Sequence, residues 1–404
     1  MTSTENDNRR KTDAPVLSLR QRRIAMLGRR GLDEKHRMAL EAPTTAFWVI
    51  LSITMIFTAL GLVMVLSSSS VVSLHSGESA WRLFRRQLLW AVVGGFGMYG
   101  AYKFPYREWR RPRWLMILGG TTAALNLIVG LVGRNINGAR AWLQWGWFRF
   151  QPSEFMKIAV ILFLADFLSK KHKWVAVKEV VLYKVGMVLG AAVVMTALLQ
   201  KDYGTALVFT CIVGTMLFMA GLPWSQVGIS AATFLVAGIA VLKMAGNASR
   251  RFTAFLDLEG TKKLDGYQVY QALLSISNGG LGGTGIGSGT SKWGYVPLAY
   301  SDFIFAVIAE ELGIIGAIAV IGGFLVLAYY GVQTALGARE MHGAFIAGGV
   351  TAWLSFQMFI NVGGIVGVIP MTGLTLPFMS YGGSSLAATM IACGLLLNVA
   401  RHMK

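Results

Sequence analysis

Charged residues are scarce in this chain: only 14% of its 404 residues are Asp, Glu, Lys or Arg. Soluble domains carry about 25%, and here 54% of the residues are hydrophobic. Uncharged runs such as 46–67, 204–222 and 313–330 approach the roughly 20 residues that a membrane helix needs. These features exclude a soluble globular protein and predict an all-α polytopic membrane protein.

Cysteine and histidine are also rare, with two and five residues respectively. Cys211 and Cys393 lie within hydrophobic runs, where cysteine is a common buried residue, so a disulfide framework is excluded. The histidines are scattered over the tail and the loops and form no metal-binding pattern. The sequence therefore predicts no definite cofactor. A divalent cation such as Mg²⁺ or Mn²⁺, held by carboxylates, remains an open alternative.

Acidic residues are outnumbered, because the chain has 37 Lys and Arg but only 19 Asp and Glu, which gives a net charge of +18. The basic excess lies in the N-terminal tail and in short loops such as 103–114 and 170–180, a pattern that orients membrane proteins. We therefore expect both termini in the cytoplasm and no nucleic-acid binding. The basic tail 1–45 either lies on the anionic leaflet or is disordered.

Window length predicts about ten spanning segments within a membrane domain at 46–400, followed by a cytoplasmic C-terminus at 401–404. The segments are expected near 46–67, 85–103, 115–132, 153–169, 181–199, 204–222, 226–245, 302–330, 343–368 and 378–399. The large loop 246–301, between the seventh and eighth segments, faces outward by the same charge pattern. Its aromatic and leucine residues predict ordered, half-buried short helices.

Ionisable residues inside membrane segments are few, and each is a functional candidate because its desolvation must be offset. Asp302 begins the eighth segment directly after the outward loop. A carboxylate at this boundary is suited to act as a general base, and partial burial would raise its pKa toward a useful range. The alternative is an N-terminal acid that only favours the helix dipole.

Glu154 and Lys157 open the fourth segment and lie three residues apart, on one face of the expected helix. Each neutralises the other in a low dielectric. The pair is interpreted as the polar floor of a substrate cavity, and the alternative is a structural ion pair between helices. In the preceding loop, Arg140 is suited to bind a phosphate, whereas Trp142 fits either a site or an aromatic interface belt.

Several longer motifs resemble the SEDS family (shape, elongation, division and sporulation) over about residues 46–400. They are NGARAWL (137–143), FQPSEFMK (150–157), QKDYGTALV (200–208), GYQVYQAL (266–273), KWGYVPLAYSDFIFAVIAEELG (292–313) and NVGGIVGVIPMTGLTLPFMSYGGSSL (361–386). The last run contains Ser384, which joins the substrate-binding candidates. The run VLSSSSV (65–71) and the long tail look most like the branch of the family that serves cell division, rather than the elongation branch.

The resemblance implies ten membrane helices and polymerisation of lipid II, the undecaprenyl-pyrophosphate disaccharide-pentapeptide. It implies that Asp302 is the essential acid and that Glu154, Lys157 and Trp142 line the cavity. The expected partners are a class B penicillin-binding protein (a transpeptidase), septal division proteins and membrane lipids. One departure is Leu298, where the family often has an acid, so no auxiliary carboxylate is expected there.

The expected reaction is inverting glycosyl transfer that forms a β-1,4 bond and releases undecaprenyl pyrophosphate. Asp302 would be the base, and Arg140, Lys157, Arg86 or a divalent ion would stabilise the leaving pyrophosphate. The alternatives are a flippase for lipid II, whose charges are expected at the midplane, and a non-catalytic septal scaffold. Gly348, Gly349 and Ala352 on the ninth segment are interpreted as a docking face for the anchor helix of a partner.

Overall fold

The computed structural model describes residues 43–75, 77–136, 138–146, 148–171, 178–222 and 246–403. The predicted tail, up to residue 42, and the predicted segment 226–245 lie outside these ranges. The long helices are α3 (Thr45–His75), α4 (Arg82–Lys103), α5 (Pro112–Val132), α6 (Pro152–Lys171), α7 (Lys178–Val193, continued by a π-helical turn at Val194–Leu199), α8 (Tyr203–Met219), α13 (Ile304–Gly337), α14 (Met341–Ile365) and α15 (Gly383–Arg401).

Five of the described helices, namely α3, α5, α13, α14 and α15, are long and apolar enough to cross a membrane, and Tyr183–Leu199 and Tyr203–Met219 are shorter apolar helices. Exposed apolar side chains such as Ile56, Met116 and Leu131 cover their outer surfaces, as expected for helices that face lipid. The predicted class, an all-helical multi-pass membrane protein, is confirmed. The count of ten spans stays a prediction.

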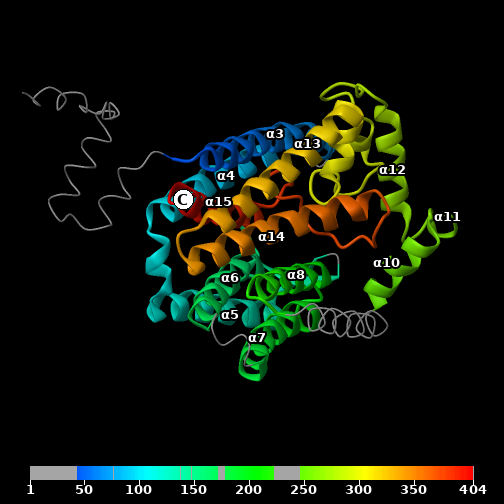
Figure 1. Cartoon of the computed structure of the whole chain (residues 1–404). Coiled ribbons are helices and arrows are strands. Elements are labelled where there is room, and N and C mark those ends of the chain that lie inside the picture. The colour runs from blue at the N-terminus through cyan, green and yellow to red at the C-terminus, as the bar shows by residue number, and fades with distance from the viewer. Residues whose placement is uncertain are drawn as a thin grey trace, which may run out of the picture. The chain divides into compact units, whose positions relative to one another are not determined.

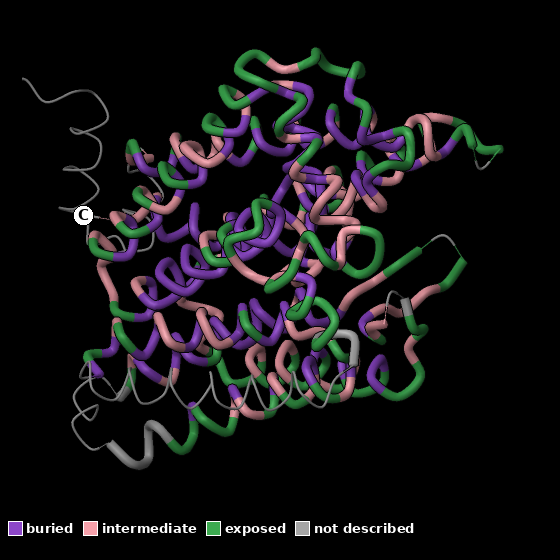
Figure 2. The backbone as a smooth tube through the Cα atoms, turned by 90° about the vertical axis from the view of Figure 1, so that its right-hand side faces the viewer, coloured by how far each residue is buried: buried purple, intermediate pink, exposed green. Residues whose placement is uncertain are grey.

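The centre of the bundle is formed by α14 and α15. Helix α15 packs along α4, while α14 packs against α13, α8 and α6 (Figure 1). A Cβ atom at Gly394 of α15 would collide with the backbone carbonyl of Met98 in α4, so glycine permits this close approach. Figure 2 shows the buried backbone concentrated inside the bundle and the exposed residues toward its periphery.

The interpretation of Gly348, Gly349 and Ala352 as a docking face for a partner is wrong, since Ala352 is also buried. A Cβ atom at Gly348 would meet Met219 of α8, and one at Gly349 would meet Ile161 of α6 and Met216 of α8. Both glycines are buried. The small residues of α14 therefore bring helices of this same chain together, and no surface remains there for another protein.

One end of the bundle carries the segment 246–301, and we call this end the loop side; the C-terminal end of α15 lies at the opposite end (Figure 1). The loop contains α10 (Gly246–Leu256), α11 (Leu258–Thr261), α12 (Tyr267–Gly279) and a 3₁₀ turn at Ser291–Trp293. The expectation of ordered short helices in this loop is confirmed. Another 3₁₀ helix, Tyr106–Arg110, follows α4.

A small antiparallel sheet, which was not predicted, lies between α5 and α6. Its strands β1 (Arg134–Ile136), β2 (Ala139–Trp145) and β3 (Phe148–Phe150) follow one another in sequence order. Leu143 pairs with Phe150, and Gly146 turns the chain between β2 and β3 with φ of +58°. The alternating apolar residues and the Asn-Gly dipeptide at 137–138 are hairpin signals. A search for long apolar runs passes over strands this short.

Helix α13 is broken near its start. Gly313 has φ of +70° and ψ of −172°, which is not helical. The glycine-rich loop after α12 supplies the missing backbone partners: Thr284 N donates to Glu310 O at 2.9 Å, and Ile314 N donates to Gly280 O at 2.9 Å. Glycine is needed at 283 and 313, because a Cβ atom at either position would overlap the backbone of the other segment.

Candidate active site

A cavity of about 890 Å³ opens among the helices and is bordered by the loop segment 246–301. Its walls come from α4, β2, α6, α8, the turn before α13 and the segment 372–385. Five of the predicted site residues line it together, namely Asp302, Glu154, Trp142, Arg86 and Ser384. Positions more than 200 residues apart in sequence thus meet in one space.

The two remaining predicted site residues lie elsewhere. Lys157 is fully buried behind Glu154 and does not reach the cavity wall. The side chain of Arg140 is exposed and is not part of the lining, although its backbone N–H donates to Gln200 O at 2.8 Å. The structure therefore places Lys157 as a support for Glu154, and Arg140 on the strand that carries Trp142.

Asp302 lies in the turn that precedes α13, so it is outside the spanning helix. Its carboxylate accepts a hydrogen bond from Ser301 Oγ at 2.9 Å. Desolvation by burial raises the pKa of the Asp302 carboxyl to about 6, and the nearby Asp202 carboxylate acts in the same direction. The hydroxyl of Ser301 and the guanidinium of Arg251 lower it. A carboxylate with this pKa is a competent proton acceptor near neutral pH.

The backbone of Asp302 is fixed by amide and hydroxyl groups from other segments. Asn361 of α14 donates to Asp302 O at 2.8 Å and to Leu374 O at 2.6 Å, which ties the turn to the segment 372–385. Ser380 Oγ donates to Ser301 O at 2.7 Å. These buried hydrogen bonds determine where the carboxylate points, and Asn361 is a positioning residue that the sequence reasoning missed.

Glu154 and Lys157 form the predicted ion pair, with 2.9 Å between Lys157 Nζ and Glu154 Oε1. Lys157 Nζ also donates to Gln357 Oε1 at 2.9 Å and lies 4.6 Å from the centroid of the Trp353 ring. Gln357 in turn donates to Thr375 O at 2.9 Å. The pair thus connects α6 to α14 and to the cavity segment 372–385, and of the two residues only Glu154 lines the cavity.

A third carboxylate, Asp202, lines the same cavity. It caps α8 by accepting from Thr205 N at 3.0 Å, and it also accepts from Gln151 Nε2 at 3.1 Å. Burial is the largest cause of its raised pKa. Gln151 N in addition donates to Ser384 Oγ at 3.2 Å, which joins the start of α6 to the start of α15. Asp202 lies within the motif QKDYGTALV but was not among the predicted site residues.

Cationic side chains surround the acids. The cavity is lined by Arg82, Arg86, Arg149, Lys201 and Arg251. Arg82 pairs with Glu78. Arg251 Nη1, from α10, donates to Thr372 O at 2.9 Å. Only Arg86 of these five was predicted, because exposed basic residues in loops are hard to distinguish from the charges that orient a membrane protein.

Two further features lie on the wall beside Asp302. Gly373 has φ of +80°, and a Cβ atom there would be 3.4 Å from Arg251 Nη1 and 3.5 Å from Asp302 Oδ2. Both distances are ordinary van der Waals contacts, so the backbone conformation, and not the space beside the base, favours glycine at this position. Leu298, which stands where the family often has an acid, also lines the cavity, and its φ of +57° is unusual for leucine.

The divalent cation remains an untested expectation. Among the described residues, no three His, Cys, Asp or Glu side chains gather closely enough to hold a metal ion. Asp302, Asp202 and Glu154, which line the cavity, form no such group within the described ranges. Basic side chains are already present for an anionic leaving group, and no reaction step is assigned to a metal.

The fold and the cavity define a multi-pass membrane protein in which a carboxylate base and several cations share one pocket on the loop side. A sequence model of the family described as "Cell cycle protein", named for FtsW, RodA and SpoVE, matches residues 47–404. The chain belongs to this family. The resemblance to the SEDS proteins is thereby confirmed.

Individual relatives agree with this assignment. The chain is 38% identical to "Stage V sporulation protein E" of Bacillus subtilis, over 88% of this chain and 97% of that protein. It is 37% identical to "Probable peptidoglycan glycosyltransferase FtsW" of Geobacter metallireducens, over 88% of this chain and 95% of that protein.

Solved structures share the fold as well. A chain from a structure titled as a peptidoglycan synthase complex that coordinates polymerization and crosslinking matches with a TM-score of 0.71 and 29% identity, over 88% of this chain and 98% of that one. The rod shape determining protein RodA of Thermus thermophilus matches with a TM-score of 0.64 and 28% identity, over 88% of this chain and 97% of that one.

Proposed function

We propose that this chain is a peptidoglycan glycosyltransferase that polymerises lipid II into β-1,4 glycan strands within the cavity. The observation that carries the proposal is the placement of Asp302, which has a pKa of about 6, in one cavity with cations from α4, α10 and the loops. A base and a set of cations are the two requirements for a sugar transfer that expels a pyrophosphate. The names of the relatives support the same activity.

In the proposed reaction, ionised Asp302 takes the proton of the 4-hydroxyl of the acceptor sugar. The oxygen then attacks C1 of the donor sugar, the new C–O bond forms, and the bond from C1 to the pyrophosphate breaks with inversion. The leaving undecaprenyl pyrophosphate keeps that electron pair. Arg86, Arg251 and Lys201 are placed on the cavity wall to stabilise its charge.

The loop side is proposed to face the outside of the cell, with the termini in the cytoplasm, because the basic loops indicate this orientation. We further propose septal synthesis as the biological role, which the relatives named FtsW favour. A class B penicillin-binding protein is the proposed partner, since a similar chain belongs to a complex that couples polymerization to crosslinking. Septal division proteins and membrane lipids complete the expected surroundings.

The test uses purified protein, fluorescent lipid II and the cognate penicillin-binding protein, with products separated on a gel. A ladder of glycan strands is expected with the wild type. Asp302→Asn should reduce turnover by about 10²–10⁴-fold, because a general base contributes that much. Leu274→Trp serves as a comparison variant with wild-type turnover expected, since Leu274 is exposed and outside the cavity lining and the base stays in place.

Polymer formation by Asp302→Asn at the wild-type rate would refute the assignment of the base. If no ladder forms under any condition, the flippase becomes the better hypothesis, because the buried pair of Glu154 and Lys157 in the predicted fourth segment also fits a transporter. Translocation of lipid II in liposomes would then be measured. Full activity of a Glu154→Ala variant would favour a scaffold.

A further inference from the structure

A second cavity, of about 450 Å³, lies on the loop side under the helices of the loop segment. Its walls are α10, the α11–α12 region and the segment that follows α14. Arg251, Gln268 and Pro297 line both this cavity and the central one. The two spaces therefore share a wall and lie next to each other, with Arg251 between the second cavity and the base Asp302.

The lining of the second cavity mixes polar and apolar groups. Arg250 and Asp265 contribute opposite charges, Phe255 and Tyr267 contribute rings, and Ile369 contributes an aliphatic side chain. Ordinary ligand pockets combine apolar walls with a few polar groups in a volume of about 300–1,000 Å³. A sugar fits this lining, because its ring has an apolar C–H face and a rim of hydroxyl groups. An acyl chain would make no use of the charged and polar groups on these walls.

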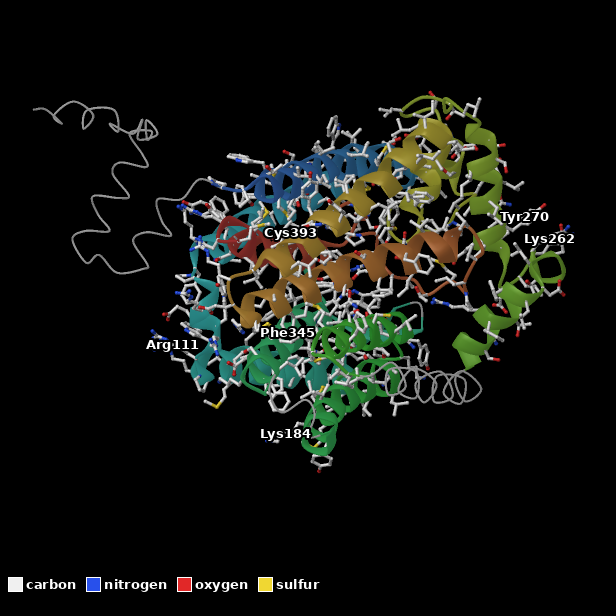
Figure 3. The ribbon with its side chains drawn as sticks, in the orientation of Figure 1. Arg111, Lys184, Lys262, Tyr270, Phe345 and Cys393 are labelled. Atoms are coloured by element: carbon white, nitrogen blue, oxygen red, sulfur yellow. The ribbon has the colours of Figure 1, made fainter. Side chains whose placement is uncertain are left out.

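Local contacts join α11 to α12 beside the second cavity. Lys262 pairs with Glu259 at 2.6 Å and lies 5.7 Å from the centroid of the Tyr270 ring, so it joins α11 to α12. Figure 3 shows Lys262 and Tyr270 together on the loop side, beyond the ends of the long helices. Asp257 caps α11 by accepting from Gly260 N at 2.8 Å. These contacts hold α11 against the start of α12, and Leu258 of α11 and Tyr267, Gln268 and Val269 of α12 line the cavity.

We propose that the second cavity is a saccharide-binding subsite that holds the glycan strand next to the sugar that reacts. The inference rests on the proposed function, since only a polymerase needs to retain its product while the next unit arrives. The strand must leave the central cavity on the loop side, and the second cavity adjoins it there. A strand that stays bound at this subsite receives more sugar units before it dissociates from the enzyme.

The experiment compares variants of residues that line only the second cavity. Val269→Trp and Ile369→Trp fill it from opposite walls, and Arg250→Glu changes its charge without adding bulk to the core. Leu274→Trp is the matched control, because Leu274 is an exposed residue of α12 outside the cavity lining. Each protein is used full length with its penicillin-binding partner and lipid II. Strand length and the rate of the first glycosidic bond are measured separately.

The expected result is shorter strands at an unchanged rate of first-bond formation. Loss of about 1.4 kcal/mol of strand binding speeds dissociation about tenfold, so the mean strand length should fall by up to about tenfold. Wild-type lengths in Val269→Trp, Ile369→Trp and Arg250→Glu would overturn the proposal. A loss of first-bond rate in step with length would also overturn it, because that pattern indicates a damaged catalytic cavity. Absence of polymer from the wild type would instead refute the proposed function.

Discussion

The buried pair of Glu154 and Lys157 allows a quantitative prediction. The Lys157 side chain is 0% exposed and that of Glu154 is 3% exposed. Within the described part of the chain, Glu154 Oε2 has no hydrogen-bond partner, so the carboxylate relies on the contact of Oε1 with Lys157. Lys157→Met should therefore leave an uncompensated buried charge. Removal of one partner from a buried ion pair costs about 3–5 kcal/mol, which raises the unfolding equilibrium constant at least about 10²-fold.

The assay is thermal unfolding of the purified protein in detergent, with activity measured on the same samples. The double variant Glu154→Gln/Lys157→Met should recover most of the lost stability, since neutral residues of similar size often replace a buried pair without loss. Lys170→Met is the matched control on the same helix. The Lys170 side chain is 52% exposed, and its partner Asp166, 2.7 Å away and largely buried, keeps Arg110 at 3.6 Å. The change should therefore cost less than Lys157→Met.

Wild-type stability of Lys157→Met would refute the reasoning, because the charge of Glu154 would then be compensated in another way. The activity of the double variant separates the two interpretations of the pair. Recovered stability with low turnover would show that the Glu154 charge acts in the cavity. Recovery of both would make the pair a structural link between α6 and α14.

Three further outcomes follow from the surroundings of Asp302. Turnover should fall as the pH drops through about 6, because protonation of Asp302 removes the base. Arg251→Gln should move this limb of the pH–rate profile to higher pH, since the guanidinium lowers the pKa of Asp302. A limb at the wild-type pH would contradict that coupling. Gly373→Ala should lower thermal stability, because its φ of +80° costs an L-residue about 1–2 kcal/mol; a variant as stable as the wild type would exclude this backbone strain. Asn361→Leu removes the hydrogen-bond donor to the carbonyls of Asp302 and Leu374, and each unsatisfied carbonyl costs about 1–3 kcal/mol of stability. The turn that carries the base should shift, so kcat should fall while KM stays near the wild-type value. A change confined to KM would contradict the positioning of the base by Asn361.

The helical bundle could be predicted from the sequence because an uncharged run near the length of a bilayer has few alternatives. The predicted segments 302–330 and 343–368 correspond to α13 at Ile304–Gly337 and α14 at Met341–Ile365. The ends differ because side-chain packing and loop contacts, and not hydrophobicity, decide where a helix stops. The sheet at 134–150 was not predicted, because three short strands contain too few residues to form a clear pattern.

The acidic part of the site was easier to predict than the rest. Asp302 and Glu154 stand out because charges are expensive inside a membrane segment. Gln357 and Asn361 carry a similar signal, as amides within the apolar run of α14, and could have been found in the same way. Arg251 had no such signal. It is exposed, and only the fold of α10 over the bundle brings it beside Asp302 and the Thr372 carbonyl.

The break in α13 has a consequence for how the protein responds to bilayer thickness. A continuous helix that tilts to match a thinner membrane also swings both of its ends. In α13 the rigid backbone connection ends at Gly313, where the glycine-rich loop takes over the hydrogen bonding of Glu310 and Ile314. Because the same loop holds both sides of the break, a tilt of the long lipid-facing part reaches the short part beside Asp302 through the loop and not through a continuous helix.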